Sequence, residues 1–194
     1  MSLELILASA SPRRKELLEQ LGISFCQKSV EIDETPYKQE IARDYVMRMA
    51  REKADVAWGI WGGAGRIILA ADTTVVVGSK TLGKPLDFQD FGSMMRLLSG
   101  REHQVLTSVI VKSGQKAEFA LSETRVHFCV LNEDDIEWYW QSGEPQDKAG
   151  GYGIQGLGAR FVKKIDGSYS GVVGLPLFET AEILFNFGIL ANRA

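Results

Sequence analysis

Side chains that could bind an anion gather where the chain reads Ser9-Ala10-Ser11-Pro12-Arg13-Arg14. An apolar stretch ends here, and Ser11-Pro12 is a typical start for a helix. A helix N-terminus attracts anions through its N–H groups and its dipole, and arginines add paired donors that match phosphate oxygens. We therefore interpret Ser9, Arg13 and Arg14 as a candidate anion site. The alternative is a plain helix start with two solvated arginines.

A single carboxylate, Asp72, directly follows the continuous apolar run from Ile67 to Ala71. Such a run is typical of a strand buried on both faces. A carboxylate at the carboxyl end of a buried strand lies where α/β sheets place their ligands. The alternative is an aspartate that caps a turn, and the neighbouring hydroxyls of Thr73 and Thr74 fit either interpretation.

Two lysines are candidate partners for an anion. Lys53 falls on the apolar stripe of a predicted helix, seven residues after Val46 and three after Ala50. A lysine at that position must either extend its stem outward to solvent or meet an anion. Lys84 precedes Pro85, which restrains its backbone, and the alternative is an ordinary surface lysine.

A metal ligand could come from the acidic segment 31–36, where Glu34 or Asp33 is the candidate. Oxygen ligands without a cluster of histidine and cysteine suit magnesium or manganese. We therefore expect a divalent metal cation, Mg or Mn, if this segment binds one. The alternative is a solvated acidic loop.

The segment from 143 to 158 is rich in glycine and carries Gln155. It contains a formal G-x-G-x-x-G at Gly151, Gly153 and Gly156, a pattern that binds dinucleotides where it follows a strand and opens a helix. Here a polar loop precedes it and a strand is predicted to follow, so we reject that interpretation. The glycines instead suit a close approach of backbone to a ligand.

The elements that must position these residues follow from hydrophobic periodicity and turn signals. Strands are predicted at 3–8, 25–30, 67–71, 75–77, 81–82, 103–112, 117–130 and 160–165. Helices are predicted at 12–21, 42–58, 88–98, 133–141 and 177–187. Strands and helices alternate, but some neighbouring strands are joined by short turns, which predicts an α/β domain with a mixed sheet.

Composition bounds the class of protein. The 194 residues predict one domain, and 45% hydrophobic residues suffice for a sizeable core. A net charge of -3 argues against a nucleic-acid binder, while a small anion needs only a local basic cluster. No apolar run is long enough for a membrane span, and Glu4 interrupts the only stretch that mimics a signal peptide. We expect a cytoplasmic protein with Cys26 and Cys129 reduced, although a disulfide stays open.

Nine segments, in order and spanning nearly the whole chain, together resemble the Maf family of nucleotide pyrophosphatases. Each is weak evidence alone, but the ordered set is specific. They are Ala8-Ser9-Ala10-Ser11-Pro12-Arg13-Arg14, Ile32-Asp33-Glu34, Arg51-Glu52-Lys53-Ala54, Ala71-Asp72-Thr73, Gly83-Lys84-Pro85, Leu98-Ser99-Gly100, Asp147-Lys148-Ala149-Gly150, Gly153-Ile154-Gln155-Gly156 and Val173-Gly174-Leu175-Pro176.

The resemblance implies a single domain over residues 1–194 with the fold of the inosine triphosphate pyrophosphatases: a mixed, elongated central sheet with flanking helices and two lobes around a cleft. It implies a homodimer that hydrolyses a nucleoside triphosphate to the monophosphate and pyrophosphate. Asp72 would be the general base, and Glu34, Lys53 and Lys84 would meet metal and phosphates.

The resemblance also points to a substrate. Arg13, Thr73 and Gln155 match the branch that prefers dTTP and UTP, whereas a branch that prefers 7-methyl-GTP tends to carry Trp, Gln and Glu there. The Gln155 amide offers a donor and an acceptor that match O4 and N3–H of thymine or uracil, and by flipping it also fits cytosine. The alternatives are a 7-methyl-GTP or inosine-type pyrophosphatase and a non-enzymatic regulator of septum formation.

Overall fold

The computed structural model describes residues 3–114 and 116–192, which form two compact units. Unit 1 comprises Met1–Asp72, Thr107–Ser122 and Gly174–Ala194, and unit 2 comprises Thr73–Leu106 and Glu123–Val173. Three long strands contribute residues to both units. They are β3 (Arg66–Val77), β5 (Glu102–Lys112) and β6 (Ala117–Phe128).

Seven strands of the described residues form one sheet with the order β2-β1-β3-β5-β6-β7, and β4 pairs with β3. Strand β1 (Glu4–Ala8) is parallel to β2 (Cys26–Lys28) and to β3. Strand β4 (Lys80–Leu82) is antiparallel to β3, and β7 (Val162–Asp166) is antiparallel to β6. The sheet is therefore mixed, and the predicted α/β class with flanking helices is confirmed.

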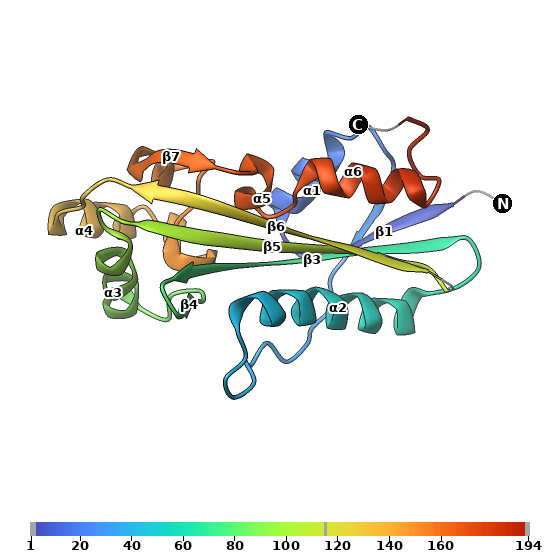
Figure 1. The fold of residues 1–194 in the computed structure, drawn as a ribbon, viewed down its shortest axis with the longest axis horizontal. Coiled ribbons are helices and arrows are strands. Elements are labelled where there is room, and N and C mark those ends of the chain that lie inside the picture. Colours follow the sequence, from blue (N-terminus) through green and yellow to red (C-terminus); the bar gives the residue numbers. More distant parts are fainter. Residues whose placement is uncertain (1–2, 115, 193–194) are drawn as a thin grey trace. The chain divides into compact units, whose positions relative to one another are not determined.

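Unit 1 is layered, with helices on opposite sides of its strands (Figure 1). The helices are α1 (Pro12–Glu19), α2 (Ala42–Trp61) and α6 (Leu177–Asn186). Its core is built where Ala50, Ala54 and Ala57 of α2 pack on strand residues that include Ile6 and Ile68. Small alanine side chains let the helix approach the sheet closely, which sets how far the other α2 side chains lie from the strands.

Unit 2 has an aromatic core in which Phe91, Phe128, Tyr139, Tyr152 and Phe161 are all buried. Phe128 and Tyr152 pack edge to face with centroids 4.7 Å apart, and Tyr139 and Phe161 do so at 5.2 Å. The helices of this unit are α3 (Phe88–Leu98), α4 (Glu133–Gln141) and α5 (Tyr169–Val173), with short 3-10 helices η1 (Glu144–Asp147), η2 (Ala149–Gly151) and η3 (Leu157–Phe161).

Several predicted boundaries are confirmed because local chemistry sets them. The Ser11 side chain caps α1, and Asn132 begins α4 with a reciprocal capping box. Gly78, at φ 59°, lies in the turn of the hairpin in which Val77 pairs with Lys80. None of the helices built from the described residues is long and apolar enough to cross a membrane. Cys26 and Cys129 are free thiols, and Cys26 is exposed.

Other predicted boundaries are wrong. Strand β3 does not stop at Ala71, because Thr73 to Val77 are all β-branched and its last three residues pair with β4. Asp72 therefore lies within a strand rather than after one. Helix α2 continues past Gly59 to Trp61, and the next residue, Gly62, caps it by donating its N–H to the Trp58 carbonyl at 2.7 Å. Strand β2 is shorter than predicted, and α5 was not predicted.

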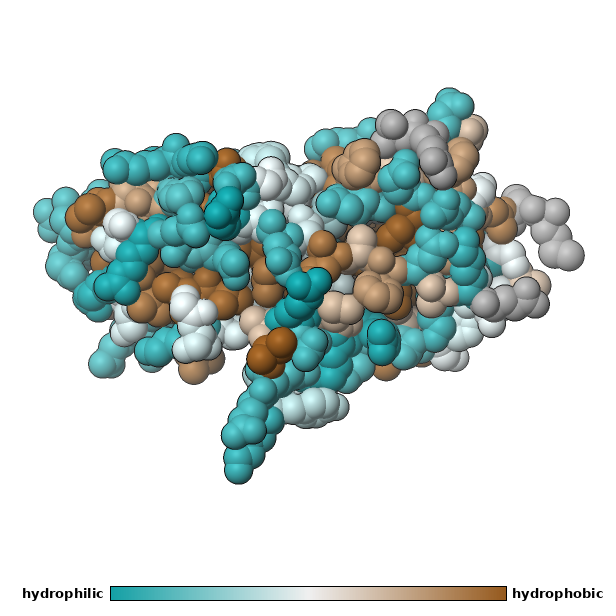
Figure 2. Space-filling view, in the orientation of Figure 1, coloured by the Kyte–Doolittle hydropathy of each residue, from teal (hydrophilic) through white to brown (hydrophobic). Residues whose placement is uncertain are grey.

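The segment between β2 and α2 projects from unit 1 as a loop, and its tip is hydrophilic (Figures 1 and 2). It is tied back to α2 rather than packed into the core. Arg48 of α2 donates to both carboxylate oxygens of Glu40, each at 2.7 Å, and to the Thr35 carbonyl at 3.1 Å. This loop carries Glu34, so the tie limits where that carboxylate can reach.

Candidate active site

The turn between β1 and α1 directs an arginine inward. Ser9 is buried, and its Oγ accepts from the Ser11 N–H at 3.2 Å and from Arg14 Nη1 at 3.3 Å. Arg14 Nε donates to the Gly174 carbonyl at 2.8 Å. The guanidinium is thus anchored on two sides, and the interpretation of two solvated arginines fails for Arg14.

Strand β2 fixes this turn from the other side. Gln27 Nε2 donates to the Ser9 carbonyl at 2.8 Å and to the Ser11 carbonyl at 3.3 Å. The predicted anion site therefore has a rigid backbone. Arg13 is partly buried on the first turn of α1, next to the positive end of that helix.

Lys53 meets two carboxylates. Its Nζ lies 2.7 Å from Asp72 Oδ1 and 2.7 Å from Glu34 Oε1. Lys53 and Asp72 expose only 13% and 12% of their side chains, whereas Glu34 exposes 52%. A lysine on the apolar face of α2 must either extend to solvent or meet an anion, and Lys53 does the second.

The surroundings of Asp72 change its acidity. Burial raises the pKa of Asp72, and the nearby Glu34 carboxylate raises it further. The positive charges of Lys53 and Arg14 and the hydrogen bond from Lys53 oppose this, but burial outweighs them. Burial likewise lowers the pKa of Arg14, because it penalises the charged guanidinium. Asp72 is thus a stronger base than an ordinary exposed aspartate.

The acidic loop offers Glu34 rather than Asp33 to this cluster. Asp33 Oδ1 accepts from the Thr35 N–H at 2.9 Å, so its carboxylate caps its own turn. The Glu34 carbonyl accepts from Tyr45 OH at 3.0 Å, which leaves the Glu34 side chain directed to Lys53. Of Glu34 and Asp33, Glu34 is the carboxylate that contacts Lys53, and its role as a metal ligand stays a prediction.

Three predicted substrate-binding residues belong to unit 2. Thr73 follows Asp72 in β3 and is partly buried, while Lys84 and Gln155 are exposed. The Gly83 carbonyl, next to Lys84, accepts from the Gly150 N–H at 2.9 Å, which ties this turn to the glycine-rich segment. Whether these residues act together with those of unit 1 stays a prediction.

The comparison with family models decides the family. The model described as "Maf-like protein" matches residues 4–187. The chain belongs to the Maf family. The predicted resemblance is confirmed, and it covers every candidate site residue.

Curated relatives in the Maf family are similar over nearly their full length. A protein named dTTP/UTP pyrophosphatase from Pseudoalteromonas translucida (strain TAC 125) is 54% identical over 181 residues, which cover 93% of this chain and 95% of that protein. One of the same name from Hahella chejuensis (strain KCTC 2396) is 50% identical and covers 95% and 92%. The prediction of a nucleotide pyrophosphatase agrees with these names.

Solved structures with a similar fold include Ham1 proteins. The Staphylococcus aureus Ham1 protein gives a TM-score of 0.47 at 10% identity, covering 82% of this chain and 79% of that one. A HAM1 protein from Coxiella burnetii gives 0.43 at 18% identity, covering 65% and 73%. Both TM-scores are low, so the fold class given above depends on the sheet and helices of this chain.

The site of this Maf protein can be tested for its fit to a divalent metal. In residues 3–114 and 116–192, no three His, Cys, Asp or Glu side chains are grouped so as to hold a metal ion. Two carboxylates, Glu34 and Asp72, nevertheless converge on one ammonium. Magnesium is commonly held by one or two carboxylates together with substrate phosphates and water, so this donor set fits such an ion.

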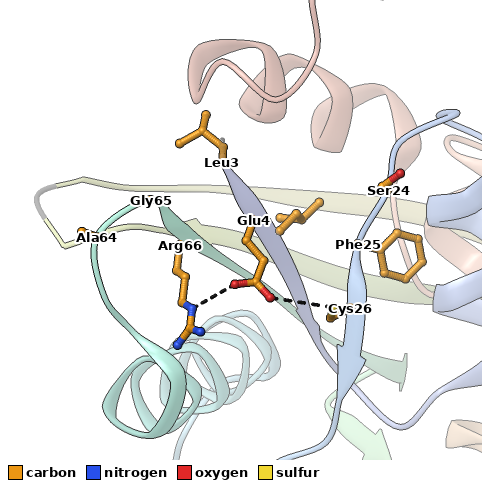
Figure 3. Close-up of a pocket in the computed structure, with 9 residues that line it drawn as sticks. Leu3, Glu4, Ser24, Phe25, Cys26, Ala64, Gly65 and Arg66 are labelled. Atoms are coloured by element: carbon orange, nitrogen blue, oxygen red, sulfur yellow. Dashed lines mark hydrogen bonds and ion pairs between the residues drawn. The ribbon is translucent and has the colours of Figure 1, made fainter. Parts of the chain in front are cut away.

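An open cavity of about 550 Å³ lies in another part of unit 1. Figure 3 shows its lining at the start of β1, where Glu4 pairs with Arg66 at 2.9 Å and Cys26 lies beside them. The cavity is at the amino ends of the parallel strands, opposite the end where β1 leads to Ser9. Ligands of α/β sheets bind at the carboxyl ends of strands, and β1 ends at Ala8 beside the Ser9 turn, so this cavity is not taken as the candidate site.

Proposed function

We propose that this protein hydrolyses dTTP and UTP to the nucleoside monophosphate and pyrophosphate, and that it needs a divalent metal cation, Mg or Mn. The observation that carries the proposal is the Lys53 ammonium held at 2.7 Å from both Asp72 and Glu34. A buried aspartate with a raised pKa, beside fixed cations, suits proton removal close to several negative phosphates. The names of the curated relatives support the choice of substrate.

The cations of the chain bind and orient the triphosphate. Arg14 is anchored by Ser9 and Gly174, so its guanidinium binds phosphate without further ordering. Arg13, Lys53 and Lys84 supply further positive charge. Phosphoryl transfer depends chiefly on positioning and charge stabilisation, which is what these side chains provide.

Asp72 acts as the general base. A water oxygen attacks the α-phosphorus, its proton passes to the Asp72 carboxylate, and the bond from the α-phosphorus to the bridging oxygen breaks as pyrophosphate leaves. Lys53 holds the Asp72 carboxylate by a 2.7 Å hydrogen bond. Glu34 would hold a divalent cation here, and such a cation would lower the pKa of water and so assist removal of this proton.

Gln155 selects the base, and Thr73 lies on the strand that carries Asp72. The amide of Gln155 donates to O4 and accepts from N3–H of thymine or uracil, and by flipping it fits CTP as a third substrate. We further propose a cytoplasmic homodimer that acts on free nucleotides and not on nucleic acid, in keeping with the net charge of -3.

A panel of dTTP, UTP, CTP, ITP, 7-methyl-GTP and dATP, each with Mg or Mn and with product analysis, tests the proposal. We expect dTTP and UTP to have the highest kcat/KM and to yield monophosphate and pyrophosphate. Preference for ITP or 7-methyl-GTP would keep the reaction and refute the substrate. Absence of turnover with every nucleotide would leave a non-enzymatic role in septum formation as the better account.

A further inference from the structure

One carboxylate in unit 2 holds the backbone that follows Gln155. Glu144 Oε2 accepts from the Leu157 N–H at 2.7 Å, and Glu144 Oε1 accepts from the Gly158 N–H at 3.1 Å. These two N–H groups begin η3, directly after Gln155 and Gly156. Glu144, the first residue of η1, therefore holds the far end of the glycine-rich segment.

A phenol holds the near end of the same segment. Tyr139 is fully buried in α4, and its OH accepts from the Gly153 N–H at 3.0 Å. The same OH donates to Glu144 Oε1 at 2.7 Å. Gly153, Leu157 and Gly158 are thus joined through one connected pair of side chains, with exposed Gln155 between them.

The glycines of this segment make room for that pair. A Cβ at Gly156 would lie 2.2 Å from Glu144 Oε2, and one at Gly158 would lie 2.5 Å from Tyr139 Oη. A Cβ at Gly153 would lie 2.6 Å from Lys148 Cε and 3.1 Å from Glu144 Oε1. Real Cβ atoms do not come within 3.0 Å, so Gly156 and Gly158 leave the space that Glu144 and Tyr139 occupy, and Gly153 leaves space for Lys148.

The Glu144 carboxylate is suited to accept three hydrogen bonds at once. Burial raises its pKa, but hydrogen bonds from Tyr139, Leu157 and Gly158 and the charge of Lys148 outweigh this, so the pKa of Glu144 is lowered overall. Lys148 Nζ also donates to the Glu144 carbonyl at 2.7 Å, which fixes the backbone of the residue. Charged acceptors form the stronger hydrogen bonds to backbone N–H groups.

We propose that Glu144 is a positioning residue for nucleotide selection: its carboxylate, with Tyr139, holds segment 153–158 in the conformation that presents Gln155 to the base. The inference rests on the proposed function, in which Gln155 contacts the base. In this proposal Glu144 acts through the segment that it holds and touches neither phosphate nor base.

An amide cannot replace this carboxylate. In Glu144→Gln, the NH2 group would face either the Leu157 N–H or the Gly158 N–H, because each carboxylate oxygen accepts from one of them. One backbone N–H would lose its acceptor in either rotamer. The size and shape of the side chain stay the same, so the change removes hydrogen bonds with little change in packing.

Kinetics of Glu144→Gln on dTTP and dATP test the proposal, with Glu137→Gln as the matched control. Glu137 is an exposed glutamate of α4 whose carboxylate accepts from Gln141 and not from the loop. We expect KM for dTTP to rise about tenfold with kcat changed less than about threefold, the size of one lost charged hydrogen bond. The dTTP over dATP preference should fall, and Glu137→Gln should match the wild type.

A double variant separates positioning from general stability. In a Gln155→Ala background, Glu144→Gln should cause no further loss of base preference, because the side chain it positions is already gone. Tyr139→Phe removes the acceptor of the Gly153 N–H and should shift KM in the same direction by a smaller factor. It supplies the second test if Glu144→Gln does not fold.

Hydrogen exchange gives a readout independent of activity. The amides of Leu157 and Gly158 should exchange faster in Glu144→Gln than in the wild type. Unchanged KM and base preference in a folded Glu144→Gln and in Tyr139→Phe would overturn this inference and leave the proposed function standing. Failure of the wild-type protein to hydrolyse dTTP would overturn both.

Discussion

The two units surround carboxylates with different partners. In unit 1, charged side chains face one another: Lys53 lies between Asp72 and Glu34. In unit 2, the Glu144 carboxylate faces backbone N–H groups of Leu157 and Gly158. Burial raises the pKa of Asp72 although Lys53 opposes this, whereas hydrogen bonds lower the pKa of Glu144 although burial opposes them.

This difference in partners suits the two carboxylates to different roles. A buried aspartate that burial makes more basic is destabilised in its charged form, which favours taking up a proton or binding a cation. A carboxylate that backbone N–H groups stabilise is a poor base and a good anchor for a loop. We therefore expect changes in unit 1 to lower kcat, and changes in unit 2 to alter selection or stability.

The largest effect should come from removing the metal. EDTA should abolish hydrolysis of dTTP, and Mg or Mn should restore it, because carboxylates of the chain and phosphate oxygens of the substrate would be the ligands. The melting temperature in EDTA should be unchanged, since the Lys53 ammonium already bridges Glu34 and Asp72. Full activity in the chelator would refute the metal, and restoration by zinc alone would indicate a different site.

The next largest effect is expected for Asp72→Asn. The amide keeps the shape but cannot take the proton of water, so kcat should fall by about 10²–10⁴ with the fold retained. Asp55→Asn is the matched control, because Asp55 also pairs with a lysine of unit 1, Lys112, but is half exposed. A folded Asp72→Asn with near-normal kcat would remove Asp72 from the mechanism and erase the contrast between the units.

A smaller and selective effect is expected for Gln155→Glu. The carboxylate keeps an acceptor for N3–H but loses the donor to O4, so kcat/KM for dTTP should fall by about tenfold. Gln146→Glu, an exposed glutamine in η1, introduces the same charge in the same region and should have little effect. Equal losses in both variants would show that charge, and not base recognition, is responsible.

The smallest effect concerns stability in unit 2. His103 is buried, its Nε2 lies 2.7 Å from Tyr152 OH, and burial lowers its pKa from 6.5 to about 4. The unfolded chain therefore binds more protons between these values, and stability is lost as pH falls from 6.5 toward 4. Between pH 7.5 and 5 this loss should be about 2 kcal/mol.

Thermal unfolding of His103→Phe at pH 7.5 and pH 5 measures that contribution. The aromatic ring keeps the edge-to-face contacts with Phe128 and Tyr152, so the variant should fold. Its melting temperature should fall less on acidification than that of the wild type, while its kcat should stay near normal. An equal fall in both proteins would mean that His103 titrates normally in the folded state.

Elements whose ends depend on neighbouring residues could be predicted from the sequence. The cap of α1 at Ser11, the capping box at Asn132 and the turn at Gly78 are each set by a few adjacent side chains. The hairpin of 75–77 with 81–82 was predicted, but the continuity of β3 through Asp72 was not. Aspartate is disfavoured in strands, so the apolar run predicts a strand that ends at Ala71.

The candidate site shows the same division. That Lys53, Asp72 and Glu34 belong to the candidate site could be predicted from spacing and motifs. The burial of Arg14 against the Gly174 carbonyl could not, because 160 residues separate them. The hydrogen bonds of Glu144 were also missed. In the sequence, Glu144 is a glutamate that precedes a proline, and its backbone partners lie 13 and 14 residues further on.

Hydrolysis of dTTP in ¹⁸O-labelled water tests the central claim most directly, namely that water is delivered to the α-phosphorus and pyrophosphate leaves. We expect the label to appear in dTMP and pyrophosphate to stay unlabelled. Label in inorganic phosphate, with dTDP as the other product, would mean attack at the γ-phosphorus and would refute attack at the α-phosphorus.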